Sequence, residues 1–250
     1  SDVIVAVMGE AADMTGEASR MANIDLQESQ QKLLKALVKT GKPVVLVLFN
    51  GRPMTLLWEQ ENVTSILDVW FGGTEAGNAV ADVLFGDYNP SGKLTATFPR
   101  STGQIPIYYN HKNTGRPYRN EEFSKFKSNY LDMPNEPLYP FGFGLSYTAF
   151  SYSDIKLSKT SLKGNETLTA SVTLTNTGKF AGEETVQLYI TDPVASVTRS
   201  VKDLKGFQKV LLQPGASKEV SFTITPNDLK FYHTDLKYDW ESGEFIIQIG

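Results

Sequence analysis

The residues best suited to chemistry lie in one acidic segment near the start of the chain. Residues 10–20 contain three carboxylates, Glu10, Asp13 and Glu17, and one guanidinium, Arg20. Hydrolysis of a glycosidic bond uses two carboxyl groups, one as acid/base and the other as nucleophile or base. A flexible loop can deliver one of them to a sugar bound elsewhere. A solvated acidic loop without chemistry has the same composition, so both interpretations stay open at this point.

This segment directly follows a predicted strand. Residues 3–8 form a continuous apolar run of β-branched character, which is typical of a strand buried on both faces. In open α/β sheets, ligands bind beyond the carboxyl ends of the strands. Asp25 and Glu28 have the spacing of a capping box, which predicts a helix that runs to about Thr40. The acidic loop therefore lies between a predicted strand and the predicted helix that follows it.

The rest of the first hundred residues alternates between strands and helices. Apolar runs at 44–48 and 65–70 predict strands, and the patterns at 54–61 and 76–84 predict helices. This alternation predicts a mainly parallel sheet with helices packed on it, an α/β sandwich domain. Residues 94–98 are a candidate for one more strand.

The last hundred residues read as all β. Short alternating runs separated by turn signals predict a β-sandwich of fibronectin III or immunoglobulin type. The predicted strands are 167–176, 184–191, 205–212, 218–224 and 244–249. Between the two halves lies a long connection, rich in Pro, Gly, Asn and Tyr, that is expected to wrap the α/β domain. The predicted division is therefore 1–100, 101–150 and 151–250.

Composition excludes several classes of function. The net charge of −4 over 250 residues gives no electrostatic reason to bind nucleic acid or an anionic membrane. The absence of cysteine excludes disulfides and thiol chemistry, and two distant histidines, His111 and His233, offer no metal-ligand spacing. We predict no metal and no cofactor. The apolar run at residues 3–8 is too short to span a membrane. From the abrupt start and end of the sequence we infer that both ends were produced by cutting a longer protein.

Several stretches, in this order along the chain, carry a resemblance to a known family. They are GKPVVLVLFNGRP at 41–53, GNAVADVLFGDYNPSGKL at 77–94, GQIP at 103–106, NTGRPY at 113–118, YPFGFGLSYT at 139–148, VTLTNTG at 172–178 and LKGF at 204–207. Together they resemble the glycoside hydrolases of family 3, specifically bacterial β-glucosidases of the periplasmic type. The resemblance covers essentially the whole chain.

The resemblance implies roles for the acidic segment. Family members are built from a (β/α)₈ barrel, an α/β sandwich domain and a fibronectin III-like domain. The barrel binds the sugar and supplies a nucleophilic aspartate, while a loop of the α/β domain supplies the acid/base glutamate. That loop matches residues 9–20 here, and the glutamate before its Ala-Ser-Arg sequence is Glu17, our first candidate for the acid/base. Glu10 ranks second, and Asp13 and Arg20 are candidate substrate-binding residues.

The resemblance also implies an activity that requires both this chain and the N-terminal barrel of the family. It predicts the C-terminal portion of a retaining, exo-acting β-glucosidase that releases terminal β-D-glucosyl residues, in the periplasm or outside the cell. The expected partners are an oligosaccharide or β-glucoside and the N-terminal barrel of the same protein. Because the barrel has no counterpart in the sequence, the chain alone is predicted to be inactive. The face that would meet the barrel is expected to be exposed, which also makes a homodimer a candidate.

An alternative interpretation is a module without catalysis. A β-sandwich can serve as a carbohydrate-binding or assembly module, because folds of this type host many functions. The binding alternative predicts exposed aromatic residues on the sandwich and direct binding of oligosaccharide to it.

Overall fold

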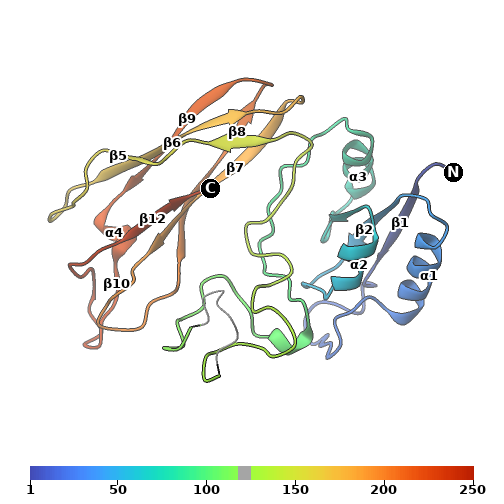
Figure 1. Ribbon diagram of the computed structural model, residues 1–250, viewed down its shortest axis with the longest axis horizontal. Coiled ribbons are helices and arrows are strands. Elements are labelled where there is room, and N and C mark those ends of the chain that lie inside the picture. The colour runs from blue at the N-terminus through green and yellow to red at the C-terminus, as the bar shows by residue number, and fades with distance from the viewer. Residues whose placement is uncertain (118–124) are drawn as a thin grey trace. The chain divides into compact units, whose positions relative to one another are not determined.

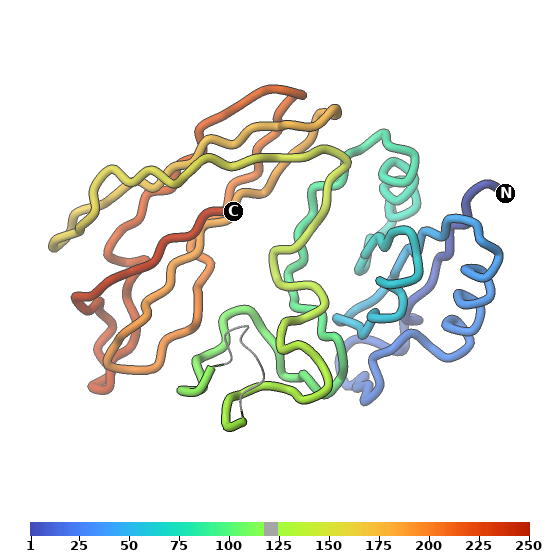
Figure 2. Tube along the Cα trace, in the orientation of Figure 1, coloured from blue at the N-terminus to red at the C-terminus, as the bar shows by residue number. Residues whose placement is uncertain are grey.

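The computed structural model describes residues 1–117 and 125–250, which form two compact units (Figure 1). The first, called here the α/β unit, comprises Ser1–Tyr88, Thr95–Tyr108 and Met133–Phe141. The second, the β-sandwich unit, comprises Asn89–Leu94, the described part of Tyr109–Asp132, and Gly142–Gly250. The predicted connection 101–150 is thus shared between the units, and the chain can be followed in and out of each in Figure 2. Residues 118–124 of that connection lie outside the described residues.

The α/β unit is built on a three-stranded parallel sheet with strand order β1-β2-β3. Its strands are β1 (Ile4–Gly9), β2 (Val44–Phe49) and β3 (Ser65–Asp68), and its helices are α1 (Glu28–Val38), α2 (Leu57–Asn62), α3 (Ala76–Phe85) and the 3₁₀ helix η1 (Thr102–Gln104). The predicted alternation of parallel strands and helices is confirmed. Because the strands are parallel, their carboxyl ends meet at one edge of the sheet, where the loops after β1, β2 and β3 begin.

Strand β1 is less buried than its sequence predicts. Ala6 and Met8 are buried, but Val5 and Val7 are 48% and 63% exposed. The expectation of burial on both faces is therefore wrong for this chain. A continuous apolar run is the pattern of a strand with two covered faces, and the described residues cover only one of them.

The predicted capping box does not form. Helix α1 has Gln27 at its N-cap position, with no side-chain hydrogen bond to the helix end. Asp25 instead accepts a hydrogen bond from the Thr55 hydroxyl, and the two residues also form an isolated parallel bridge. Spacing alone predicted the box, but a long-range partner occupies the carboxylate that would have capped the helix.

Residues 94–98 do not form a continuous strand. Phe98 makes an isolated antiparallel bridge to Tyr139, and its ring packs edge-on against Trp70 and Tyr139, with centroids 5.7 and 6.2 Å apart. At 1% exposure, Phe98 anchors this segment in the core of the α/β unit. Leu94 pairs differently, through backbone hydrogen bonds with Gly142 and Phe143. The apolar run is therefore split between two sets of partners.

The β-sandwich unit contains two larger antiparallel sheets and a small third one in which β10 pairs with β11. In one of the larger sheets, β7 lies between β12 and β8; in the other, β6 pairs on one side with β9 and on the other with the short strands β4 and β5. The bounds are β4 (Phe150–Tyr152), β5 (Lys156–Leu157), β6 (Leu168–Asn176), β7 (Gly182–Thr191), β8 (Asp203–Leu212), β9 (Ser217–Ile224), α4 (Pro226–Leu229), β10 (Phe231–Tyr232), β11 (Tyr238–Asp239) and β12 (Ile246–Ile249). All five predicted strands are present.

The core of the sandwich comes from alternate residues of these strands. Leu174, Val186 and Val220 are at most 1% exposed, and each lies on the inner face of a different strand. Alternation of inward apolar and outward polar residues is what predicted the sandwich from sequence. Within 1–117 and 125–250, no helix is long and apolar enough to cross a membrane.

Candidate active-site loop

The acidic loop leaves the sheet at a tightly held point. The Gly9 N–H donates to Gln30 Oε1 at 2.9 Å, and Gln30 Nε2 donates back to the Gly9 carbonyl at 2.8 Å. Gly9 has φ +137°, and a Cβ there would lie 1.8 Å from the Phe49 carbonyl oxygen, so only glycine fits. The start of the loop is therefore fixed by the amide side chain of α1 and by the neighbouring strand β2.

Glu10 is held in an ion pair rather than presented to solvent. Its side chain is 4% exposed, with Oε1 lying 2.8 Å from Arg52 Nε and Oε2 accepting the Gly51 N–H at 3.0 Å. Arg52 Nη2 in turn donates to the backbone carbonyls of Met14 and, at 3.0 Å, Ser19. Arg52, which follows β2, thus ties Glu10 to both halves of the loop.

Glu17 lies at the tip of a tight turn. The turn spans Gly16 to Ser19 and is closed by the Ser19 N–H donating to the Gly16 carbonyl at 3.2 Å. Ala18, in the third position, has φ +62°, a left-handed conformation that costs a non-glycine residue roughly 1–2 kcal/mol. Glu17 is exposed, and its carboxylate has no hydrogen-bond or ion-pair partner among the described residues. The turn presents Glu17 while Arg52 holds its base.

The other two candidate residues, Asp13 and Arg20, do not form a common site within the described part of the chain. Asp13 and Arg20 are both exposed, and neither side chain forms an ion pair within the described part of the chain. The Asp13 carbonyl accepts a weak hydrogen bond from the Ser19 hydroxyl at 3.4 Å. The predicted set of four is therefore divided: Glu10 is packed inside the loop, and the other three are displayed on its outer side.

Gly51 allows the loop to lie close to the turn after β2. A Cβ at Gly51 would fall 2.0 Å from Thr15 Oγ1 and 2.7 Å from the Phe71 ring. Any side chain there would have to displace the loop or the ring. The sequence around Asn50 to Pro53 reads as a turn, and its role in supporting the acidic loop could not be seen from spacing alone.

Two polar residues at the carboxyl edge of the sheet were missed by the sequence reasoning. Asn50, which follows β2, is fully buried, and Asp68 ends β3 with both carboxylate oxygens buried. Burial raises the pKa of Asp68 to about 6, while the Trp70 backbone and the Asn50 amide act in the opposite direction. The only signal in the sequence was their position directly at strand ends.

This geometry suits proton transfer by a single carboxylate. A loop with a fixed base and an exposed carboxylate at its tip can offer one acid/base group to a ligand bound outside the chain. It does not provide a pair of carboxylates facing a common ligand, because Glu10 is occupied by Arg52. Among the described residues no group of three or more His, Asp or Glu side chains could hold a metal ion.

A parallel sheet with an acidic loop, followed by an antiparallel β-sandwich, is the combination that the sequence resemblance predicts. The family model for the glycosyl hydrolase family 3 C-terminal domain matches residues 1–147, and the model for the fibronectin type III-like domain matches residues 184–250. The chain therefore belongs to glycosyl hydrolase family 3, in which it corresponds to the C-terminal domain and the fibronectin III-like domain.

Relatives named as glycosidases match the chain over its full length. It is 55% identical to the periplasmic beta-glucosidase of Salmonella typhimurium, of which it covers 33%, and 46% identical to a beta-xylosidase of Formosa agariphila, of which it covers 34%. The chain thus spans about a third of the length of the relatives that it matches.

Solved structures show the same relationship. The beta-glucosidase of Listeria innocua, crystallised as a mutant with laminaribiose, is 45% identical with a TM-score of 0.94; all of this chain matches 34% of that one. The beta-D-glucoside glucohydrolase of Trichoderma reesei is 28% identical with a TM-score of 0.78, and the chain covers 38% of it.

Proposed function

We propose that this chain is the C-terminal portion of a retaining, exo-acting β-glucosidase and that Glu17 is its general acid/base. In the complete protein, Glu17 protonates the leaving glycosidic oxygen and then deprotonates the incoming water. The nucleophile and most of the sugar pocket belong to the N-terminal barrel. The substrate is an oligosaccharide or β-glucoside with a terminal β-D-glucosyl residue, and the protein acts in the periplasm or outside the cell, as the name of the Salmonella relative suggests.

One observation carries the choice of Glu17. Its carboxylate is exposed at the tip of a turn whose base is fixed by Arg52, whereas the Glu10 carboxylate is buried against Arg52. An acid/base must approach its substrate within hydrogen-bond distance, which a displayed carboxylate can do and an internally paired one cannot do without breaking its ion pair. The same contacts suggest that Glu10 and Arg52 are positioning residues that hold the loop.

The exposed apolar residues of the α/β unit are evidence that another part of the same protein covers them. Val5 and Val7 of β1 are about half or more exposed, as is Leu33 of α1. Phe71 and Phe85, at 66% and 84%, are more exposed still. Exposed apolar surface of this kind is typical of residues that another part of the protein covers. We assign it to the N-terminal region, which makes up the remaining length of the relatives.

The acid/base role is tested in the full-length protein. Glu17→Gln is expected to lower kcat/KM, which reports the glycosylation step, about 10²–10⁴-fold on a disaccharide, and much less on an aryl glucoside whose leaving group needs no proton. Azide should restore turnover of an aryl glucoside by Glu17→Ala, because the azide anion attacks the covalent glycosyl-enzyme without needing a general base and releases a glycosyl azide. Glu61→Gln, at an exposed glutamate of α2 outside the loop, is the matched control and should change kcat/KM little.

The two glutamates are separated by the same rescue experiment. Rescue of Glu10→Ala by azide, with none for Glu17→Ala, would move the acid/base to Glu10. If Glu10 only positions the loop, azide has no effect on Glu10→Ala, and circular dichroism shows whether that variant still folds. The chain alone should be inactive on aryl β-glucosides and gain activity only when mixed with the N-terminal region; activity of the chain alone would contradict the proposal.

A further inference from the structure

The β-sandwich unit contains a pocket that the proposed acid/base chemistry does not use. It has a volume of about 390 Å³, within the roughly 300–1,000 Å³ range of small-molecule sites. Its floor consists of core residues from both sheets, among them Leu168 of β6, Ile190 of β7 and Ile224 of β9. The pocket therefore opens between the two sheets at one end of the sandwich.

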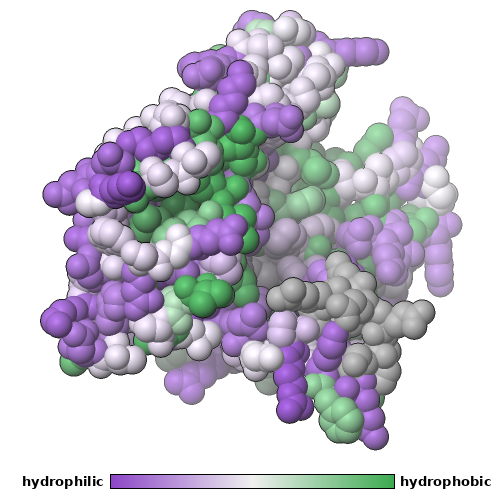
Figure 3. Space-filling view, turned by 60° about the vertical axis from the view of Figure 1, so that its left-hand side comes forward, coloured by the Kyte–Doolittle hydropathy of each residue, from purple (hydrophilic) through white to green (hydrophobic). Residues whose placement is uncertain are grey.

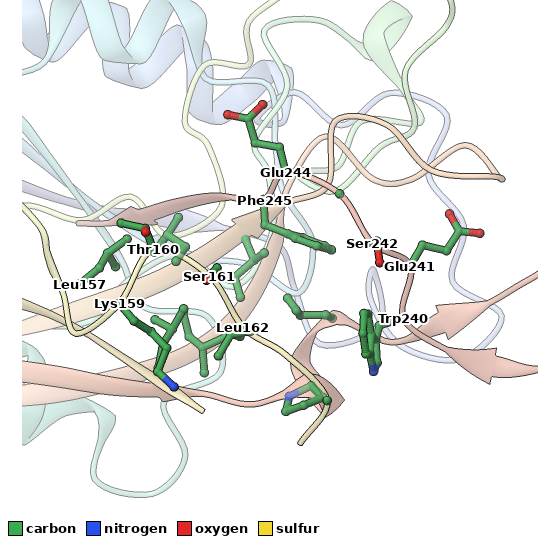
Figure 4. A pocket seen from close by; sticks show the side chains of 18 residues that line it. Leu157, Lys159, Thr160, Ser161, Leu162, Trp240, Glu241, Ser242, Glu244 and Phe245 are labelled. Carbon is green, nitrogen blue, oxygen red and sulfur yellow. The ribbon is translucent and has the colours of Figure 1, made fainter. Parts of the chain in front are cut away.

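The walls of the pocket include two aromatic side chains, Trp240 and Phe245. In Figure 4, Leu157 and Trp240 lie at opposite ends of the pocket, with Phe245 and Leu162 between them. Trp240, Phe245 and Leu162 are partly buried residues packed against the sandwich core. Their rings and methyl groups are held in place rather than free to collapse into the space, so the apolar lining is preformed.

The rim of the pocket is polar, and its hydroxyls are available. Thr160, Ser161 and Ser242 line it, and their hydroxyls have no hydrogen-bond partner within the described protein. Figure 3, which brings the β-sandwich forward, shows hydrophobic residues in a hollow bordered by hydrophilic ones. A ligand here would meet both carbon surface and hydrogen-bonding groups.

The charges on the rim are largely engaged. Lys159 Nζ lies 3.1 Å from Glu166, and Glu241 lies 3.0 Å from His233 Nδ1 while it accepts the Ser196 N–H at 2.9 Å. In Figure 4 the carboxylates of Glu241 and Glu244 point away from the Trp240 ring. Among the described residues that line the pocket, Lys159 is the one cation and is already paired with Glu166, and the other charges are carboxylates, so the site favours a neutral ligand.

We infer that this pocket of the β-sandwich binds a neutral saccharide ring. A pyranose has apolar C–H faces that can pack on Trp240 and Phe245, and hydroxyls that can bond to the rim of Thr160, Ser161 and Ser242. A small aromatic compound such as phenol would use the walls but leave most of the rim hydroxyls unpaired. A saccharide uses both parts of the lining. The site would let the sandwich hold a sugar, independently of whether Glu17 acts as acid/base.

The inference is tested by NMR titration of the 250-residue chain with cellobiose, laminaribiose and xylobiose, and with phenol as an aromatic comparison. At least one disaccharide should cause saturable shifts of the Trp240 indole N–H and Gly243 amide signals, with Kd on the order of millimolar. Trp240→Ala should raise Kd about tenfold or more. Ser242→Trp fills the mouth from an exposed position, and should abolish binding even if Trp240→Ala fails to fold.

Two controls fix the location. Tyr232→Ala removes an aromatic ring that is 66% exposed and does not line the pocket, and it should leave Kd unchanged, as should Glu17→Gln. Absence of saturable binding to every disaccharide, binding of phenol alone, or saccharide binding that survives Ser242→Trp would overturn the inference. None of these results depends on hydrolysis, so the proposed function stands or falls separately.

Discussion

The two units differ in how completely their residues satisfy one another. Across the described residues, every buried side-chain nitrogen or oxygen without a hydrogen bond belongs to the α/β unit: Asn50 Oδ1, Arg52 Nε, Glu59 Oε1 and both oxygens of Asp68. Arg52 Nε still lies 2.8 Å from Glu10, but without hydrogen-bond geometry. The β-sandwich buries Asn176 and Asp192 with partners for each.

Apolar exposure does not follow this division, because the sandwich also exposes large apolar side chains, among them Val194 at 81% and Leu236 at 80%. The sandwich gathers its inward residues into one core, whereas helix α3 of the α/β unit has no fully buried residue and β1 displays two valines. Unpaired buried polar atoms are a cost that a self-sufficient domain avoids. The comparison indicates that the buried side-chain polar groups of the sandwich are satisfied among the described residues, while several of those in the α/β unit are not.

The largest expected effect tests the completeness of the sandwich core. Leu174 of β6 is fully buried, so Leu174→Ala should lower the unfolding free energy of this unit by about 2–5 kcal/mol. Leu211→Ala in β8, where the side chain is 60% exposed, is the matched control and should cost much less. Native-state hydrogen exchange of the sandwich amides measures both. A similar small loss for the two variants would show that the core is loosely packed.

The alternation of inward apolar and outward polar residues along each strand allowed the sandwich to be predicted from the sequence. The run 167–176 predicted β6 to within one residue of Leu168–Asn176, because inward and outward residues alternate wherever one face is buried. No comparable local rule existed for the loop. Its anchors depend on Arg52, more than thirty residues beyond the groups that it binds, and Asp25 bonds to Thr55 instead of capping its helix. Long-range polar pairing leaves no period in a sequence.

The exposed face of β1 shows a second limit of sequence reasoning. The valines of the 3–8 run correctly indicate a strand, but their burial depends on what lies against the sheet. A pattern reports the environment in which a strand evolved, which can include residues outside the chain at hand. For the site, the sequence could propose Glu17 only through the family resemblance; three carboxylates in eight residues do not distinguish a displayed group from a paired one.

A second prediction contrasts one buried aspartate in each unit. The pKa of Asp68 is raised to about 6 from 3.8, chiefly by desolvation, so the folded state binds its proton more tightly than the unfolded chain. Its contribution to stability is full below about pH 4 and is lost as the pH rises through about 6, a change of about 3 kcal/mol. Asp68→Asn cannot ionise and should therefore be more stable than the parent at pH 7.5.

The counterpart in the sandwich should respond in the opposite direction. Burial also raises the pKa of Asp192, but its carboxylate lies 2.9 Å from Arg199 Nη1. Asp192→Asn removes the nearer of the two carboxylates beside Arg199, leaving Asp203 at 3.7 Å from Nη2, and should lower stability by about 1–3 kcal/mol at pH 7.5. Urea unfolding at pH 5 and 7.5, followed unit by unit through hydrogen exchange, measures both. Destabilisation of the α/β unit by Asp68→Asn would mean that the Trp70 backbone and the Asn50 amide stabilise the ionised carboxylate by more than burial costs it.

The smallest expected effect concerns backbone strain, which both units contain. Ala18 has φ +62° beside Glu17, and Leu236 has φ +65° in the turn after β10. Glycine at either position removes the strain of a left-handed side chain but increases the entropy of the unfolded chain, so each unit should gain no more than about 1 kcal/mol. If the turn at Ala18 serves to present Glu17, only Ala18→Gly should also lower kcat of the full-length protein, because a glycine turn samples more conformations. Leu236→Gly should leave kcat unchanged. If the two variants change kcat equally, the left-handed conformation of Ala18 has no specific role in presenting Glu17.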